Sequence, residues 1–281
     1  MKLELNPLLY EDLLRTAFAE DLGLVGDVTS DAIIPASTQA TLVLRNREPG
    51  TIAGLQVAAR AFTLLNPNLT VEIQAMEGTT VEAYTDLAVV SGSARSILTA
   101  ERTALNLACR MSGIATQTRR IVDAVEGTGA TVVCTRKTTP GLRAVEKYAV
   151  RAGGGKNHRF GLSDAVLIKD NHIAVAGSLT KAVEAARANV GHLMKIEVEV
   201  DTLEQLDELL AVGADVVLLD NMDPAMLTEA VAAVDGRMIT EASGGITPDT
   251  ARAKAESGVD LLSIGWLTHS SPILDIGLDQ G

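Results

Sequence analysis

"MKIEVEVDTLEQLDELLAVGADVVLLD", residues 194–220, is typical of an apolar strand, a helix and a second apolar strand. The two outer segments are short and rich in Val, Leu and Ile, while leucine recurs at helical spacing between them. Gly213 stands where such a helix should end. Parallel strands need a crossover of this kind, so the stretch predicts one β-α-β unit of a parallel sheet.

The same alternation extends over the chain from about residue 130 onward. The expected strands are residues 131–135, 164–169, 194–200, 215–220, 237–243 and 261–265. Their nearly continuous apolar character indicates a sheet buried on both faces, with right-handed crossovers. A barrel and a doubly wound sheet both satisfy this pattern, and we favour the barrel.

The first half of the chain has a mixed rhythm. An amphipathic N-terminal helix precedes short strands that are separated by glycine and proline turns. Residues 93–125 then predict a long helix, which we expect to be interrupted near Gly113. This half is typical of an α+β domain.

Composition excludes several classes of protein. The formal charge of −12 argues against nucleic acid or an anionic membrane as a partner of the general surface. No apolar run reaches the roughly 20 residues that span a bilayer, and the N-terminus does not resemble a signal peptide. Cys109 and Cys134 lack metal-site spacing and are expected to be reduced core thiols. We therefore expect a soluble, cytoplasmic protein.

Polar or glycine residues cluster where each of the six expected strands ends. They are Arg136, Lys137, Lys169, Glu199, Asp220, Ser243, Gly244, Gly245 and Gly265. The carboxyl ends of parallel strands open on one side, where ligands bind in α/β folds. These residues are therefore expected to converge on a common site.

Cations are concentrated between Arg136 and Lys169, in contrast with the acidic chain as a whole. The strand ends and the glycine-rich loop carry Arg136, Lys137, His158, Arg159 and Lys169. Because like charges repel, such a cluster indicates a ligand with several negative charges. Arg143, Lys147 and Arg151 are spaced by four and are instead expected to form an exposed helix stripe.

Two acids are expected at the same edge. Glu199 and Asp220 end consecutive strands, where carboxylates can accept hydrogen bonds from sugar hydroxyls or stabilise a cationic transition state. The alternative is that they only neutralise neighbouring lysines. Glu197 alternates with Glu199, and we expect one side chain to point into the barrel and the other outward. Glu199 is assigned to the site because it lies nearer the strand end.

The last two strands end in glycine turns, "ASGGITP" and "SIGW". Glycine lets main-chain N–H groups approach an anion, and phosphate sites recur at the last strands of (β/α) barrels. The chain contains neither a GxxxxGK[ST] P-loop nor a GxGxxG dinucleotide motif after a strand. The combined pattern predicts a phosphorylated sugar and a carboxylate-bearing partner as ligands.

Several motifs, in order over nearly the whole chain, resemble the quinolinate phosphoribosyltransferase family. The most specific is "GGGKNHRFGLSDAVLIKDNH" at residues 153–172, accompanied by "ERTALN", "TRKTTPGLR", "EVEV", "LLDN" and "EASGGI". The resemblance implies an α+β sandwich domain over residues 1–115, joined by the tail 268–281. It also implies an incomplete (β/α) barrel of about six strands over residues 116–267. The family forms homodimers in which one subunit's N-terminal domain covers the other's barrel mouth.

The resemblance implies transfer of phosphoribosyl from phosphoribosyl pyrophosphate to quinolinate, with Mg²⁺, in NAD biosynthesis. The products are nicotinate mononucleotide, pyrophosphate and CO₂. The residues implied for substrate binding are Arg102, Thr135, Arg136, Lys137, His158, Arg159, Lys169, Glu199, Asp220, Ser243, Gly244, Gly245, Ile264, Gly265 and Trp266. Lys137, Glu199 and Asp220 are the expected catalytic residues.

The roles that the resemblance implies differ along the chain. The carboxylates of quinolinate would be held by Arg136, His158, Arg159 and Lys169, with Arg102 from the partner subunit. Lys137 would lie near the reacting centre. Glu199 and Asp220 would contact ribose hydroxyls and water around Mg²⁺, with no residue binding the metal directly. The turns at 243–245 and 264–266 would receive the 5′-phosphate. The roles of His172 and His269 stay open.

Two alternatives are kept. One is a related barrel enzyme that acts on another aromatic acid, such as a molybdenum-operon paralogue of this family. The other is a non-catalytic sensor of a phosphosugar. The pairing of Arg136 and Lys137 with Glu199 and Asp220 argues against a sensor, which has no need of both sets of charges.

Overall fold

The computed structural model describes residues 3–280 and divides the chain into two compact units. Unit 1 comprises the chain up to residue 119, residues 138–154 and the chain from residue 266, and unit 2 comprises residues 120–137 and 155–265. The elements of unit 1 are η1 (Pro7–Leu9), α1 (Glu11–Leu22), α2 (Val28–Ile33), β1 (Gln39–Asn46), β2 (Gly50–Thr51), α3 (Leu55–Leu65), β3 (Thr70–Ile73), β4 (Thr80–Val81), β5 (Asp86–Ser93), most of α4 (Ala94–Ala124), α5 (Arg143–Ala152), α11 (Trp266–His269) and β12 (Ile276–Gln280). Those of unit 2 are β6 (Thr131–Val133), β7 (Val166–Ile168), α6 (Asp170–Ala176), α7 (Leu179–Asn189), β8 (Ile196–Val200), α8 (Leu203–Val212), β9 (Val216–Asp220), α9 (Pro224–Val234), β10 (Ile239–Ser243), α10 (Pro248–Ala255) and β11 (Leu261–Ser263).

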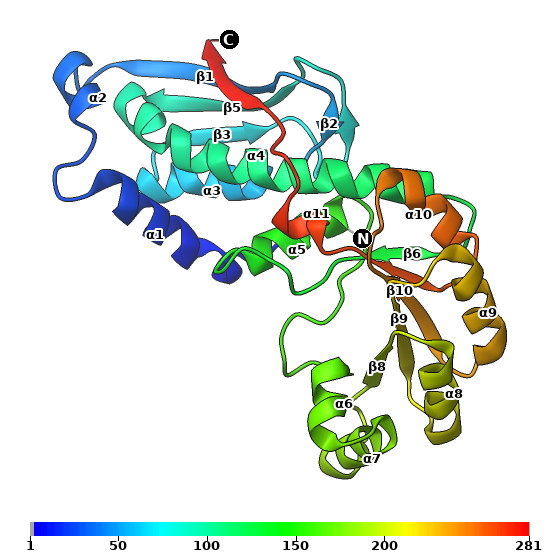
Figure 1. Ribbon diagram of the computed structural model, residues 1–281. Coiled ribbons are helices and arrows are strands. Elements are labelled where there is room, and N and C mark those ends of the chain that lie inside the picture. Colours follow the sequence, from blue (N-terminus) through cyan, green and yellow to red (C-terminus); the bar gives the residue numbers. More distant parts are fainter. Residues whose placement is uncertain (1–2, 281) are drawn as a thin grey trace. The chain divides into compact units, whose positions relative to one another are not determined.

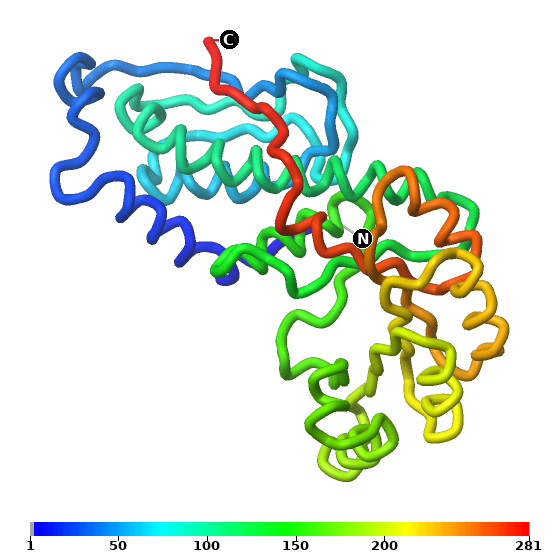
Figure 2. The backbone as a smooth tube through the Cα atoms, viewed as in Figure 1, coloured from blue at the N-terminus to red at the C-terminus, as the bar shows by residue number. Residues whose placement is uncertain are grey.

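Unit 1 is built on a four-stranded antiparallel sheet of order β12-β1-β5-β3. Figure 1 shows α3 and α4 along one face of this sheet. The C-terminal strand β12 pairs with β1 from Leu42 opposite Gln280 to Asn46 opposite Ile276, and its path is the red end of the tube in Figure 2. Helices on one face of an antiparallel sheet are the arrangement of an α+β fold, which confirms the fold predicted for this part of the chain.

Helix α4 is continuous over 31 residues, so the predicted interruption near Gly113 is wrong. A Cβ atom at Gly113 would lie 2.0 Å from the carbonyl oxygen of Pro272. Because Gly113 has no side chain, the C-terminal segment at Pro272 can pack directly against α4. A single glycine costs a helix only about 1 kcal/mol relative to alanine, and packing against this segment compensates for that cost.

Unit 2 contains six parallel strands in the order β6-β11-β10-β9-β8-β7. From β7 to β11 the neighbours are consecutive in sequence, so every crossover advances in the same direction. A doubly wound sheet would reverse direction at an internal strand. The order therefore confirms the barrel, which is incomplete because β6 and β7 form the two edges of the sheet. Figure 1 shows α8 and α9 beside β8–β10, as crossover helices that cover the strands.

Helix α5 corrects the expectation of an exposed cationic stripe. Lys147 is only 1% exposed, and the adjacent Glu146 is fully buried in an ion pair of 2.9 Å with Arg110. Seven of the ten residues of α5 are buried. Spacing by four places Arg143, Lys147 and Arg151 on one side of a helix, but it does not reveal that other elements of the fold cover that side.

Two predictions from composition concern the chain as a whole. Among residues 3–280, no helix combines the length and the apolarity that crossing a membrane requires. Cys109 and Cys134 are buried thiols that form no disulfide with each other, as predicted.

Candidate active site

Most of the predicted site residues lie at the carboxyl-terminal edge of the six-stranded sheet in unit 2. They follow or end the strands in chain order: Thr135, Arg136 and Lys137 after β6, Lys169 after β7, Glu199 in β8, Asp220 in β9, Ser243, Gly244 and Gly245 at β10, and Ile264 and Gly265 after β11. The parallel register places Asp220 directly opposite Ser243 on the neighbouring strand. Arg102 and Trp266 belong to unit 1.

Lys169 and Glu199 form an ion pair across β7 and β8. The Lys169 ammonium donates to Glu199 Oε2, and the Glu199 side chain is only 12% exposed while that of Lys169 is 45% exposed. One carboxylate oxygen of Glu199 is therefore occupied. The predicted alternative, that the acids neutralise nearby lysines, describes this contact, although it does not exclude a further contact of Glu199 with a ligand.

Glu197 contradicts the expectation that it and Glu199 point to opposite faces. Both side chains reach groups of the site: Glu197 contacts His158, and Glu199 contacts Lys169. Residues i and i+2 of a strand share a face, so the expectation was wrong on geometric grounds. Glu197 is 5% exposed, which makes it a buried carboxylate beneath the strand ends.

His158 lies in the loop that precedes β7, and both of its ring nitrogens have partners within unit 2. Nε2 lies 3.0 Å from Glu197 Oε2 and 3.6 Å from Glu241 Oε1. Nδ1 accepts the main-chain N–H of Arg159 at 2.8 Å. Glu241, which the sequence analysis did not select, is 1% exposed in the middle of β10. The signal that could have found it is an acid inside an otherwise apolar strand.

Arg159 supplies the clearest electrostatic evidence for an anion site. Its guanidinium donates to the Ala165 carbonyl at 2.8 Å. Burial lowers the pKa of the Arg159 guanidinium, and repulsion from Arg136 lowers it further, while Glu197 and Asp164 act in the opposite direction. Two guanidinium groups that repel each other are stabilised by a bound anion, and each can grip a carboxylate with two hydrogen bonds.

The turn after β9 holds Asp220 against the turn after β10. Asn221 Nδ2 donates to Asp220 Oδ2 at 2.6 Å, and the Asn221 main-chain N–H donates to Ser243 O at 3.0 Å. Asn221 adopts a left-handed conformation with φ of 54°. The buried ammonium of Lys254 donates to Met222 O at 2.8 Å, and burial lowers its pKa. Asn221 and Lys254 are thus structural supports of this edge that the sequence analysis did not identify.

The glycine turn after β10 has two residues with positive φ, Gly244 at 84° and Gly245 at 61°. A Cβ atom at Gly244 would lie 2.0 Å from Asn221 Oδ1, whereas one at Gly245 would meet nothing within 4 Å. Thr247 then caps the N-terminus of α10 through the N–H of Thr250. The turn therefore keeps its main chain uncovered at Gly245, next to a helix start that favours negative charge.

The two glycines provide a matched pair of variants for a stability test. Gly245→Ala should cost about 1–2 kcal/mol of unfolding free energy, because an L-residue is strained at positive φ. Gly244→Ala should cost about 2 kcal/mol more, because its methyl group also overlaps the Asn221 side chain. Urea unfolding of both variants measures the difference, and equal losses would contradict the proposed close packing of the two turns.

The two histidines whose roles were left open have local partners. His172 Nδ1 accepts the main-chain N–H of Lys169 at 2.9 Å, so this ring caps α6 directly after β7. In unit 1, His269 Nδ1 contacts the Ser270 hydroxyl. The contact of His172 is the kind expected of a residue that stabilises a loop.

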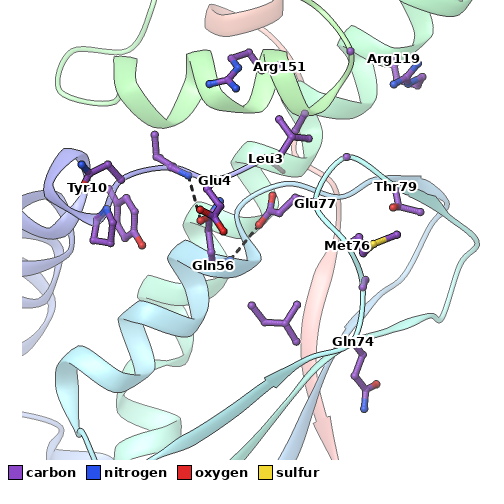
Figure 3. Close-up of a pocket in the computed structure, with 18 residues that line it drawn as sticks. Leu3, Glu4, Tyr10, Gln56, Gln74, Met76, Glu77, Thr79, Arg119 and Arg151 are labelled. Atoms are coloured by element: carbon purple, nitrogen blue, oxygen red, sulfur yellow. Dashed lines mark hydrogen bonds between the residues drawn. The ribbon is translucent and has the colours of Figure 1, made fainter. Parts of the chain in front are cut away.

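A separate pocket of about 1210 Å³ lies within unit 1 and contains none of the predicted site residues. Figure 3 shows Gln56 and Glu77 at its wall. Gln56 accepts the N–H of Leu5 at 3.3 Å and donates to the Tyr148 hydroxyl at 2.6 Å. Glu77 accepts the Gly54 N–H at 2.8 Å, and burial raises the pKa of its carboxyl. These groups bond to one another and tie the N-terminal segment to α3, so we interpret this pocket as structural.

Comparison with known proteins gives a consistent result over both units. The family model "Quinolinate phosphoribosyl transferase, C-terminal domain" matches residues 114–279, and the model of the N-terminal domain matches residues 27–112. The carboxylating nicotinate-nucleotide pyrophosphorylase of Mycobacterium leprae is 48% identical, over 95% of this chain and 96% of that protein. The probable enzyme of the same name from Bacillus subtilis is 44% identical, over 98% of this chain and 94% of that protein.

Solved structures agree with these sequences. The crystal structure of NadC from Streptococcus pyogenes is similar with a TM-score of 0.94 and 41% identity, and covers 98% of this chain and 97% of that chain. The nicotinate-nucleotide pyrophosphorylase from Francisella tularensis gives a TM-score of 0.93 at 35% identity, with 99% of each chain covered.

The incomplete parallel barrel has cations and two acids at its carboxyl edge. This arrangement places the chain in the class of α/β enzymes that bind anionic ligands at the strand ends. Within that class, the sequence matches are decisive. The chain belongs to the quinolinate phosphoribosyltransferase family.

Proposed function

We propose that this protein transfers the phosphoribosyl group of phosphoribosyl pyrophosphate to quinolinate and decarboxylates the product. The products are nicotinate mononucleotide, pyrophosphate and CO₂, as in de novo NAD biosynthesis. The observation that carries the proposal is the position of Arg136, Lys169, Glu199 and Asp220 at one edge of the parallel sheet, in a chain of this family.

The cationic side of the edge is suited to the pyridine dicarboxylate. Arg136 and Arg159 offer planar donors that match carboxylates, and Lys169 adds a charge next to Glu199. His158 belongs to the same loop as Arg159, and Thr135 accepts the main-chain N–H of Lys137 at 3.0 Å, which shapes the turn after β6. These contacts support quinolinate as the acceptor.

The acidic side is suited to the ribose. Loss of pyrophosphate leaves positive charge on the sugar, which the carboxylates of Glu199 and Asp220 stabilise, while Lys137 lies near the departing pyrophosphate. Most of the rate gain comes from positioning and from charges placed in advance. The turns at residues 243–245 and 264–266 receive the 5′-phosphate through main-chain N–H groups.

Mg²⁺ fits this arrangement only as an ion carried by the substrate. Glu199 and Asp220 provide hard oxygen donors of the kind it prefers. One oxygen of Glu199 already accepts from Lys169, which favours contact through water over direct coordination. When bound, the ion would neutralise charge on the pyrophosphate.

Ribosyl transfer precedes decarboxylation in this proposal. Breaking the C–CO₂ bond leaves an electron pair on the carbon beside the ring nitrogen, and that carbon then takes a proton. Alkylation makes the nitrogen cationic and so stabilises the electron pair. Rapid quench should trap the undecarboxylated nucleotide, and isotope effects that place CO₂ loss first would overturn this order.

The proposed activity is tested by incubating the protein with both substrates and Mg²⁺ and measuring nicotinate mononucleotide. A parallel reaction with nicotinate in place of quinolinate tests the paralogue alternative, because nicotinate offers the cation cluster one carboxylate where quinolinate offers two. We expect turnover with quinolinate and little with nicotinate. Absence of product with quinolinate would reject the proposed function.

We further propose a homodimer in which Arg102 of one subunit completes the partner's site. Arg102 lies in unit 1 with 65% of its side chain exposed, so it is available to a second molecule. Arg102→Ala should lower activity by about 10²-fold, because a charged contact to substrate is lost. Mixing it with Lys137→Ala subunits should restore up to a quarter of wild-type activity. Mixed dimers without restored activity would count against a shared site.

A further inference from the structure

Two buried carboxyl groups lie beneath the strand ends and have no role in the reaction as described so far. Glu197 comes from β8 and Glu241 from β10, and they are 5% and 1% exposed. Within residues 3–280, Oε1 of each lacks a hydrogen-bond partner. Buried carboxyl groups are costly unless they are paired, so a specific arrangement must compensate for them.

His158 connects this pair to the substrate side of the edge. Its Nε2 contacts Glu197 at 3.0 Å and lies 3.6 Å from Glu241, while its Nδ1 accepts the N–H of Arg159 at 2.8 Å. Because Nδ1 accepts a hydrogen bond, it carries no proton. This network therefore assigns His158 the neutral tautomer with its proton on Nε2. Hydrogen bonds thus run from Glu197 through His158 to the peptide that carries Arg159, and the Glu241 carboxyl lies next to the same ring nitrogen.

Glu241 holds its proton more tightly than an ordinary carboxyl group does. Burial, followed by repulsion from Glu197, raises the pKa of Glu241 to about 7, while His158, Ser263 and Lys169 act in the opposite direction. Around neutral pH Glu241 therefore retains much of its proton. Burial and repulsion from Arg136 lower the pKa of the Arg159 guanidinium, and Glu197 opposes that lowering.

We propose that Glu197 and Glu241 are positioning residues of the dicarboxylate subsite, which act through His158 and Arg159; this inference rests on the proposed function. One buried negative charge orients His158 and balances the guanidinium groups before the substrate binds. A second charge, on Glu241, would reduce the attraction of the same groups for a dianion.

The first test separates binding of the two substrates. Glu197→Gln keeps the shape but removes the charge, and should raise KM for quinolinate about tenfold, while KM for phosphoribosyl pyrophosphate changes less than about twofold. Thr240→Val is the matched control: Thr240 is buried in β10 but bonds to Asp260 at the amino end of the sheet. This control should lower stability without changing either KM. Equal changes in both KM values for Glu197→Gln would overturn the proposal.

The second test uses pH. In the wild type, KM for quinolinate should rise about tenfold as the pH increases from 6.5 to roughly 8.5, because Glu241 loses its proton within that range. Glu241→Gln mimics the protonated carboxyl. Its KM for quinolinate should therefore equal that of the wild type at about pH 6.5 and stay constant as the pH increases. A Glu241→Gln profile that rises as the wild type does would overturn the proposal.

A third measurement is made on the wild-type protein, and variants serve only to assign its signals. Nitrogen-15 NMR of the histidine rings in the free wild-type protein should show one ring that stays neutral, with its proton on Nε2, at pH 7. The Glu197→Gln spectrum or, if that variant does not fold, His158→Asn assigns the signal. An imidazolium at this position would contradict the network. A stoichiometric divalent metal that resists dialysis and is lost in Glu241→Gln would also contradict the network, because His158, Glu197 and Glu241 would then be metal ligands.

The outcomes for the two proposals can be distinguished. A wild type that forms no product rejects the proposed function, whereas an active wild type with unaffected variants rejects this inference alone.

Discussion

Lys137→Ala should lower kcat by about 10²–10³-fold, while the free energy of unfolding changes by less than about 0.5 kcal/mol. Lys137 is exposed after β6, so its removal leaves no cavity. In the proposed reaction its ammonium meets the negative charge that grows on the departing pyrophosphate. Steady-state kinetics and urea unfolding measure the two quantities separately.

Lys195→Ala is the matched control for Lys137. Lys195 is also an exposed lysine beside a strand of unit 2, but it precedes β8 and pairs with Asp215 at the amino end of the sheet. Its removal should leave kcat within about twofold of the wild type. Near-normal turnover of Lys137→Ala, or an equal loss in both variants, would refute the assignment of Lys137 to the reacting centre.

Glu199→Gln should lower kcat by about 10²-fold and affect KM less. The variant keeps the volume of the side chain but removes the charge that we expect to stabilise the positive ribose in the transition state. It also removes the ionic partner of Lys169, so the ammonium becomes free to bind another anion. The split between kcat and KM distinguishes a transition-state role from one in ground-state binding.

Asp201→Asn is the control for this second prediction. Asp201 directly follows β8 and is exposed, which places a carboxylate two residues beyond Glu199 in the same chain segment. Its neutralisation should change kcat by less than about twofold. If both variants lose activity equally, the loss is due to the total negative charge at this edge of the sheet. The specific role assigned to Glu199 would then be wrong.

Much of the architecture could be predicted because its signals are local. Apolar segments of strand length alternate with helical repeats, and polar residues appear where each strand must leave the core, as at Lys169 and Asp220. The predicted break at Gly113 was wrong because a glycine in a helical pattern can mark either a break in the helix or a close contact with another segment. Only the position of Pro272 in the structure distinguishes these two explanations. The exposed stripe failed at Lys147 for a similar reason, since periodicity does not show which side of a helix is covered.

The sequence by itself determined the β-α alternation, the order of the strands' polar ends and the family, because these depend on residues that are neighbours or belong to one motif. Only the tertiary structure decided that Glu197 and Glu241 meet at His158, and that Asn221 lies against Gly244. Those contacts join residues that lie tens of positions apart in the chain. They depend on the pairing register of parallel strands, which no local pattern specifies.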